Sequence, residues 1–184
     1  PESPYPAAID DVLHAYKWLL EKGEKPEDII FSGDSAGGGL TIASFMKIRD
    51  QKLPMPKAGI CFSPWTDLTF SGESPRENWK TEIMVNPLHP PGWVNSYVGK
   101  DSAKNPYISP LFGDVSGLPP LLIQVSTAEA IYDDSTRFAN LAANTDTKIT
   151  LQEWDDMPHV WQMMASVLPE GRDALNKVGK FVEA

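Results

Sequence analysis

The chain has 184 residues, 41% of them hydrophobic, and its six Trp, seven Phe and five Tyr can bury a substantial core within one domain. Its formal net charge is -9 and it has no basic run, which argues against nucleic-acid binding. No apolar stretch approaches the roughly 18 residues that a membrane span needs. Cys61 is the only cysteine, which excludes an internal disulfide and a thiolate metal cluster and suits a reducing, cytoplasmic environment.

In chain order, hydrophobic spacing alternates between helix-like and strand-like segments. The first helix is expected to stop at Gly23, a candidate C-terminal cap. Helices are predicted at about 7–22, 40–51, 133–144 and 171–182, and buried strands at 29–31, 58–62, 120–126 and 148–154. This alternation predicts an α/β fold, with a mainly parallel sheet and helices on both faces.

A long irregular segment interrupts the pattern after the second strand. Residues 63–120 are rich in Pro, Ser, Asn, Gly and Trp, and connections in compact domains are usually much shorter. We therefore expect a cap-type insertion at about 66–118. Aromatic residues in or near it, among them Trp65, Trp93 and Tyr97, are candidates to line an apolar pocket, although packing onto the sheet explains each of them at least as well.

The first glycine cluster has the spacing G-x-S-x-G and lies directly between a predicted strand and a predicted helix. In Gly33-Asp34-Ser35-Ala36-Gly37, the two outer glycines suit the sharp turn of a nucleophile elbow. The following helix is expected to begin near Ala36, and its N-terminus favours negative charge, so the Ala36 N–H is a candidate oxyanion donor. Neither common phosphate-binding glycine motif is present. The pattern therefore predicts Ser35 as a nucleophile.

A serine nucleophile needs a base, and a carboxylate must orient that base. Among the three histidines, only His159 follows the last predicted strand and has candidate acids between itself and Ser35. Glu129 lies in the loop after the strand at 120–126, where the acid is expected. Asp133 is the alternative acid, although it is expected to lie in the first turn of the next helix.

These residues resemble the hormone-sensitive-lipase-like branch of the α/β hydrolases, also called family IV or fold-3 esterases. The segments "GDSAGG", "SPWTDLTFSGES", "SPLFGDVSGLPPLLIQVS", "EAIYDDSTRFA" and "MPHVWQ" occur in the family's order. The resemblance implies a carboxylesterase for short or medium acyl chains, with a triad of Ser35, His159 and Glu129 and no cofactor. Glu129 stands where most members carry Asp. The resemblance gives Asp67 in "PWTDL" a structural role.

The resemblance also implies parts that this sequence does not contain. The family's H-G-G-G oxyanion motif lies upstream of the segment that matches residue 1, and this chain lacks it. We therefore expect the chain to be the C-terminal portion of a longer enzyme. Its N-terminal strands and cap helices would then belong to an upstream segment, in the same or a separate chain. Family members often form homodimers, so a homodimer is a candidate assembly.

Other functions fit the same residues. Amide or carbamate hydrolysis can use the same triad, because pocket shape and not the motif selects the substrate. A small-molecule receptor of this fold loses the histidine, so His159 argues against it. A truncated, inactive fragment that works only within a two-chain enzyme is the third alternative.

Overall fold

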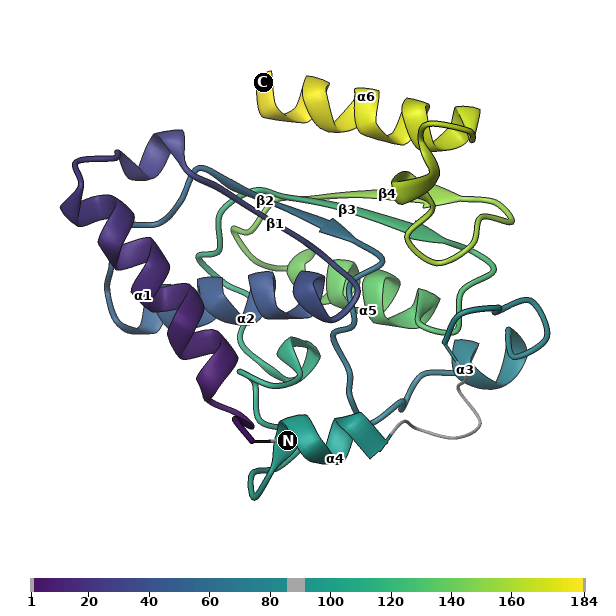
Figure 1. Cartoon of the computed structure of the whole chain (residues 1–184), viewed down its shortest axis with the longest axis horizontal. Helices are drawn as coiled ribbons and strands as arrows, with labels where there is room; N and C mark the ends of the chain where they lie inside the picture. Colours follow the sequence, from purple (N-terminus) through teal and green to yellow (C-terminus); the bar gives the residue numbers. More distant parts are fainter. Residues whose placement is uncertain (1, 86–91, 184) are drawn as a thin grey trace.

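A computed structural model describes residues 2–85 and 92–183, apart from the side chain of Trp93. Its centre is a sheet of four parallel strands (Figure 1). Their order in the sheet is their order in the sequence: β1 (Ile30–Asp34), β2 (Ala58–Phe62), β3 (Leu121–Ser126) and β4 (Ile149–Trp154). Parallel neighbours require crossover connections: one long helix joins β1 to β2, another joins β3 to β4, and a longer segment joins β2 to β3.

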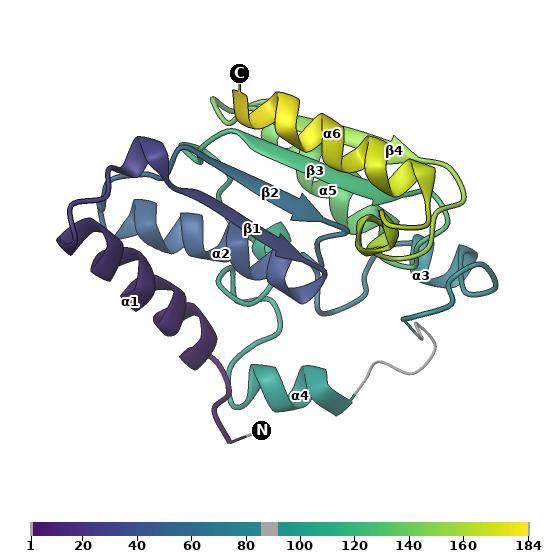
Figure 2. The same cartoon turned by 45° about the horizontal axis from the view of Figure 1, so that its top comes forward.

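Helices cover both faces of the sheet, as the alternating pattern predicts (Figures 1 and 2). One face carries α2 (Ala36–Asp50) and α5 (Tyr132–Ala142), and the other carries α6 (Pro169–Glu183). Helix α1 (Ala7–Glu21) packs against α2 and ends directly before its C-cap Lys22, which is followed by Gly23 with positive φ. The predicted α/β fold is therefore confirmed.

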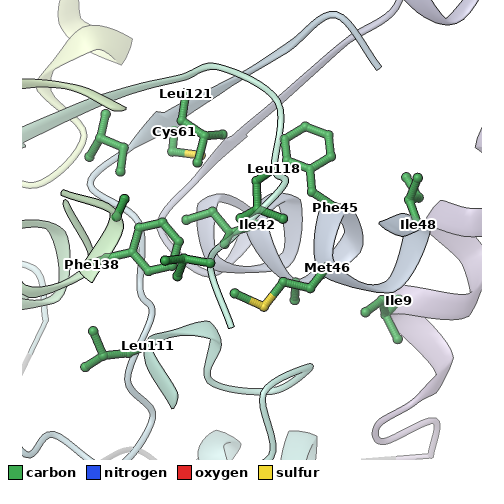
Figure 3. Packing of buried hydrophobic residues seen from close by; sticks show 14 of the residues in the cluster. Ile9, Ile42, Phe45, Met46, Ile48, Cys61, Leu111, Leu118, Leu121 and Phe138 are labelled. Carbon is green, nitrogen blue, oxygen red and sulfur yellow. The ribbon is translucent and has the colours of Figure 1, made fainter. Parts of the chain in front are cut away.

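The main core lies between the sheet and α2, and Figure 3 shows its packing. Ile42, Phe45 and Met46 project from α2 and are at most 1% exposed. They meet Leu121 of β3 and Phe138 of α5, which are both fully buried. Burying each such side chain stabilises the fold by roughly 1.5–3 kcal/mol, so this layer fixes the position of α2 against the strands.

The hydrophobic spacing marks only residues 40–51 of α2, while the elbow pattern places the start of the helix near Ala36. The helix starts at Ala36, directly after the serine, as the elbow pattern predicts. Glycines at 37–39 carry no side chain and so give no helical periodicity, which is why the hydrophobic spacing misses this turn. This start brings the helix N-terminus to the serine.

The described parts of the segment after β2, residues 63–85 and 92–120, form short helices and a small core of their own. They contain α3 (Ser74–Glu77), α4 (Gly92–Val98) and the 3₁₀ helix η2 (Pro110–Phe112). Two other 3₁₀ turns are η1 (Pro26–Asp28) and η3 (Trp161–Met164). A separate buried cluster joins the segment to the residue before α5: Trp65, Leu68, Val98, Ile108 and Ile131. Its action as a cap stays a prediction.

No helix in the described parts of the chain is long and apolar enough to cross a membrane.

Candidate active site

Ser35 occupies the single residue between the end of β1 and the start of α2. Its backbone has φ 53° and ψ −120°, a conformation that costs a non-glycine residue free energy and is typical of a nucleophile elbow. The Ser35 N–H donates to the Phe62 carbonyl at 2.8 Å, and the Trp65 N–H donates to the Ser35 carbonyl at 2.9 Å. Bonds from the end of β2 therefore hold the strained residue on both sides.

The glycines around Ser35 have different steric surroundings. A Cβ at Gly33 would lie 2.2 Å from the Gly37 carbonyl oxygen, and one at Gly39 would lie 2.0 Å from the Trp65 carbonyl oxygen. A Cβ at Gly37 would meet nothing within 4 Å. The elbow pattern predicts that neither Gly33 nor Gly37 has room for a side chain. Of these two glycines, only Gly33 lacks room for a Cβ among the described residues, because the Gly37 backbone fills the space beside Gly33.

Asp34 and Ala36 complete the elbow. Asp34 ends β1 and is exposed, while Ala36 is the first residue of α2 and is also exposed. Backbone N–H groups in the first turn of a helix have no partner within the helix. The Ala36 N–H therefore lies where a developing negative charge beside Ser35 would be stabilised.

His159 and Glu129 form a buried pair. The His159 Nδ1 lies 2.6 Å from the Glu129 Oε2, and the two side chains are 5% and 1% exposed. The other ring nitrogen, Nε2, is buried and has no hydrogen-bond partner among the described residues. Such an imidazole is held at one nitrogen and is open for proton transfer at the other.

The second oxygen of Glu129 is held by two serines that the sequence analysis did not single out. Glu129 Oε1 accepts from the Ser63 hydroxyl and from the Ser126 N–H, each at 2.8 Å. The Ser126 hydroxyl in turn accepts from the Met157 N–H at 2.9 Å. This bond connects the loop that carries Glu129 (the acid loop, residues 127–131) to the loop that carries His159 (the histidine loop, residues 155–160). Both serines directly follow or end a parallel strand, the position that marked the other candidates, and that signal could have found them.

The segment after β2 also holds the acid loop. The Asn78 side-chain amide donates to the carbonyls of Thr127 and Glu129, each at 2.8 Å. The Glu82 carboxylate accepts from the Ala130 N–H at 3.1 Å. The loop that carries Glu129 is thus bonded both by the two serines and by this segment.

The alternative acid, Asp133, is bonded elsewhere. Its Oδ2 accepts from the backbone N–H groups of Glu73 at 2.5 Å and Ser74 at 3.0 Å. It therefore fixes the N-terminal end of α3, while the structure brings Glu129 to the histidine. Although Asp133 lies in the first turn of α5, as predicted, its hydrogen bonds go to another segment.

Asp134 and Asp67 are two further buried carboxylic acids, connected through the backbone of Asp67. Asp134 Oδ2 accepts from the N–H groups of Thr66 at 2.6 Å and Asp67 at 2.7 Å. Burial raises the pKa of Asp134 to about 8, and the negative charge of Asp67 acts in the same direction. Burial also opposes ionisation of Asp67, but hydrogen bonds from Ser71 and Thr69 outweigh it and lower its pKa.

An apolar cavity of about 300 Å³ opens beside Ser35. This volume is at the lower end of the range for small-molecule sites. Trp65 and Tyr97, two of the predicted pocket residues, line it, whereas the side chain of the third, Trp93, lies outside the described residues. Its apolar walls come mainly from α2, the segment after β2 and the residue before α5: Leu40, Trp65, Leu68, Val85, Val94, Tyr97, Tyr107, Ile108 and Ile131.

No group of three or more His, Cys, Asp or Glu side chains in residues 2–85 and 92–183 is placed to hold a metal ion.

The profile of the α/β-hydrolase fold family matches residues 1–163. The chain belongs to this family. An acetyl-hydrolase of Streptomyces hygroscopicus is 41% identical over 182 residues, which cover 99% of this chain and 61% of the relative. An esterase of Acinetobacter venetianus is 38% identical over 98% of this chain and 60% of its own length. The chain therefore spans about three fifths of the length of these curated relatives.

Solved structures agree with this assignment. A crystal structure of EstE5 soaked with ethyl alcohol superimposes with a TM-score of 0.96 at 44% identity, over 100% of this chain and 62% of that one. An esterase of the bacterial hormone-sensitive lipase family has a TM-score of 0.96 at 42% identity, over 99% and 61%. The predicted resemblance to the hormone-sensitive-lipase-like branch is therefore confirmed.

Proposed function

We propose that this α/β hydrolase is a serine carboxylesterase that cleaves short- to medium-chain carboxylic esters through an acyl-serine intermediate. One observation carries the proposal: the buried pair of His159 and Glu129, with the Nε2 of the histidine left without a partner, in a fold whose elbow strains Ser35. Names of relatives support the reaction class, because they include an acetyl-hydrolase and an esterase.

The chemistry follows from the two ring nitrogens. Ser35 Oγ attacks the ester carbonyl carbon while His159 Nε2 takes the hydroxyl proton, and Glu129 stabilises the imidazolium through Nδ1–H. The carbonyl π electrons move onto oxygen, where the Ala36 N–H and the N-terminus of α2 stabilise the charge. As the C–O bond to the alcohol breaks, His159 returns its proton to the leaving group. Water then repeats both transfers and releases the acid and free Ser35.

The cavity supports an acyl-chain or alcohol site next to the serine. Its apolar walls favour a hydrocarbon group over a charged one. An upstream segment with further oxyanion donors and a homodimeric assembly stay predictions of the family resemblance.

A fluorophosphonate probe tests the proposal directly. We expect it to label Ser35, located by mass spectrometry, and we expect labelling to disappear in Ser35→Ala and to fall strongly in His159→Ala. Failure to label correctly folded protein would contradict the proposal and favour an inactive fragment. Comparing esters with amides of the same acyl group then separates the esterase from the amidase, because the amidase would cleave both.

A further inference from the structure

Ser63 contacts both Glu129 and the loop that carries His159, which together would activate Ser35. It follows the last residue of β2, Phe62, whose carbonyl accepts the Ser35 N–H. Its hydroxyl lies 2.8 Å from Glu129 Oε1 and 3.3 Å from the backbone nitrogen of Val160, the residue after His159. Ser63 is itself fully buried, so no water competes for these bonds at its surface.

The direction of these hydrogen bonds is fixed by the groups involved. A backbone N–H can only donate, so the Val160 N–H gives its proton to the Ser63 oxygen. The single Ser63 hydroxyl proton is then directed to Glu129, which accepts it as a carboxylate. One side chain thereby connects the acid to the histidine loop and has no second proton for another partner.

Backbone conformation shows what these bonds hold in place. Ser35, Ser63 and Val160 all have positive φ, of 53°, 45° and 54°. A positive φ is a genuine outlier for a β-branched residue such as Val160 and persists only where surrounding contacts impose it. The Ser63 hydroxyl supplies one of those contacts, immediately beside His159.

We propose that Ser63 is a positioning residue, which holds Glu129 against His159 Nδ1 and fixes the histidine loop, and this inference rests on the proposed esterase function. Without its hydroxyl, Glu129 Oε1 keeps only the Ser126 N–H, and the Val160 N–H loses its acceptor. The carboxylate then samples orientations in which it no longer fixes the imidazole, while the apolar cavity stays intact.

The test compares Ser63→Ala, Ser63→Gly and a matched control in the intact protein. Ser135 is also fully buried, but its hydroxyl has no hydrogen-bond partner among the described residues, so Ser135→Ala removes an equivalent atom without this role. With a p-nitrophenyl ester, we expect Ser63→Ala to lower kcat at least about tenfold with little change in KM. Ser135→Ala is expected to retain the wild-type kcat.

Two further comparisons separate positioning from a general effect on stability. Glycine accepts a positive φ readily, so if strain at residue 63 were decisive, Ser63→Gly would match the wild type; we expect it to be as slow as Ser63→Ala. If Ser63 acts through the acid, Ser63→Ala will cost little more in a Glu129→Ala background. Wild-type kcat in Ser63→Ala would overturn the inference, and an equal loss in both backgrounds would overturn the action of Ser63 through Glu129.

A measurement independent of turnover separates this inference from the proposed function. A short carboxylate–imidazole hydrogen bond gives a far-downfield Nδ1 proton resonance in the NMR spectrum. We expect this resonance in the wild type and in Ser135→Ala, and its loss or shift in Ser63→Ala. If wild-type protein neither turns over ester nor labels at Ser35, the proposed function fails, and an unchanged resonance in Ser63→Ala would overturn the positioning role separately.

Discussion

At the scale of single residues, the two nitrogens of one imidazole have opposite surroundings. His159 Nδ1 is bonded to Glu129 at 2.6 Å, whereas the buried Nε2 has no partner among the described residues. A buried polar atom without a partner costs about 1–3 kcal/mol. Folding accepts such a cost mainly where a site needs the atom free, which in the proposed mechanism serves to exchange a proton with a serine hydroxyl or a leaving group.

A residue-scale prediction concerns the identity of the acid. Glu129→Gln removes the negative charge and allows an amide N–H to face Nδ1, which selects the wrong imidazole tautomer. We expect kcat to fall by roughly 100- to 10,000-fold with KM little changed, measured by steady-state ester hydrolysis. Asp133→Asn is the matched control and should keep the wild-type kcat, because Asp133 bonds Glu73 and Ser74 instead. The reverse ranking would make Asp133 the acid.

At the scale of elements, the strand–turn–helix unit of β1 and α2 depends on close backbone approach. The Gly33 Cα faces the Gly37 carbonyl, and the glycines at 38 and 39 face Pro64 and Trp65 of the chain that leaves β2. Three consecutive glycines weaken a helix N-terminus by propensity, yet here they let two connections meet beside Ser35. Packing therefore decides the start of α2 against intrinsic helix preference.

An element-scale prediction contrasts the two elbow glycines. Gly33→Ala places a methyl group 2.2 Å from a backbone oxygen that cannot move aside, so we expect a loss of about 3 kcal/mol or more in unfolding free energy. Gly37→Ala meets open space and gains helix propensity, so we expect no loss and up to about 1 kcal/mol of stabilisation. Urea denaturation measures both. Equal destabilisation would show that Gly37 is packed by residues other than those described.

At the scale of the whole molecule, buried polar groups join the segment after β2 to α5 and to the acid loop. Asp134 of α5 accepts two N–H groups from residues 66 and 67, and Asn78 donates to two carbonyls of the acid loop. The Asp67 carboxylate, fully buried, pairs with Arg137 of α5 at 3.3 Å. The structural role expected for Asp67 therefore agrees with its contacts, which connect two distant parts of the chain.

A whole-molecule prediction follows from the raised pKa of Asp134, about 8 against 3.8 for the free side chain. Between these values the folded protein holds a proton that the unfolded chain releases, so stability is highest at low pH within this window and falls as pH rises through about 8. We expect the Asp134 contribution to drop by about 2 kcal/mol between pH 6 and pH 8.

The matched variant for this effect is Asp134→Asn, whose amide oxygen can still accept the N–H groups of Thr66 and Asp67. We expect the difference in unfolding free energy between pH 6 and pH 8 to shrink by that amount, measured by urea denaturation at both values. A variant with the same pH dependence as the wild type would show that Asp134 is ionised in the folded protein throughout this range.

The sequence by itself determined the α/β alternation, because buried parallel strands are short apolar runs and helices show their period in hydrophobic spacing. It also located Ser35, Glu129 and His159 as candidates, since each follows a strand and the carboxyl ends of parallel strands meet at one edge of the sheet. The start of α2 at Ala36 followed from the elbow pattern and not from hydrophobic spacing, because glycine carries no hydrophobic signal.

Only the tertiary structure shows that Glu129 contacts His159, while Asp133, four residues later, bonds another segment. It also assigned the steric demand to Gly33 and not to Gly37, and it brought Ser63 to the acid from 66 residues away. The physical reason is the same in each case: local sequence sets which segments form, but the direction of a side chain and its hydrogen-bond partners depend on segments that are distant in the chain.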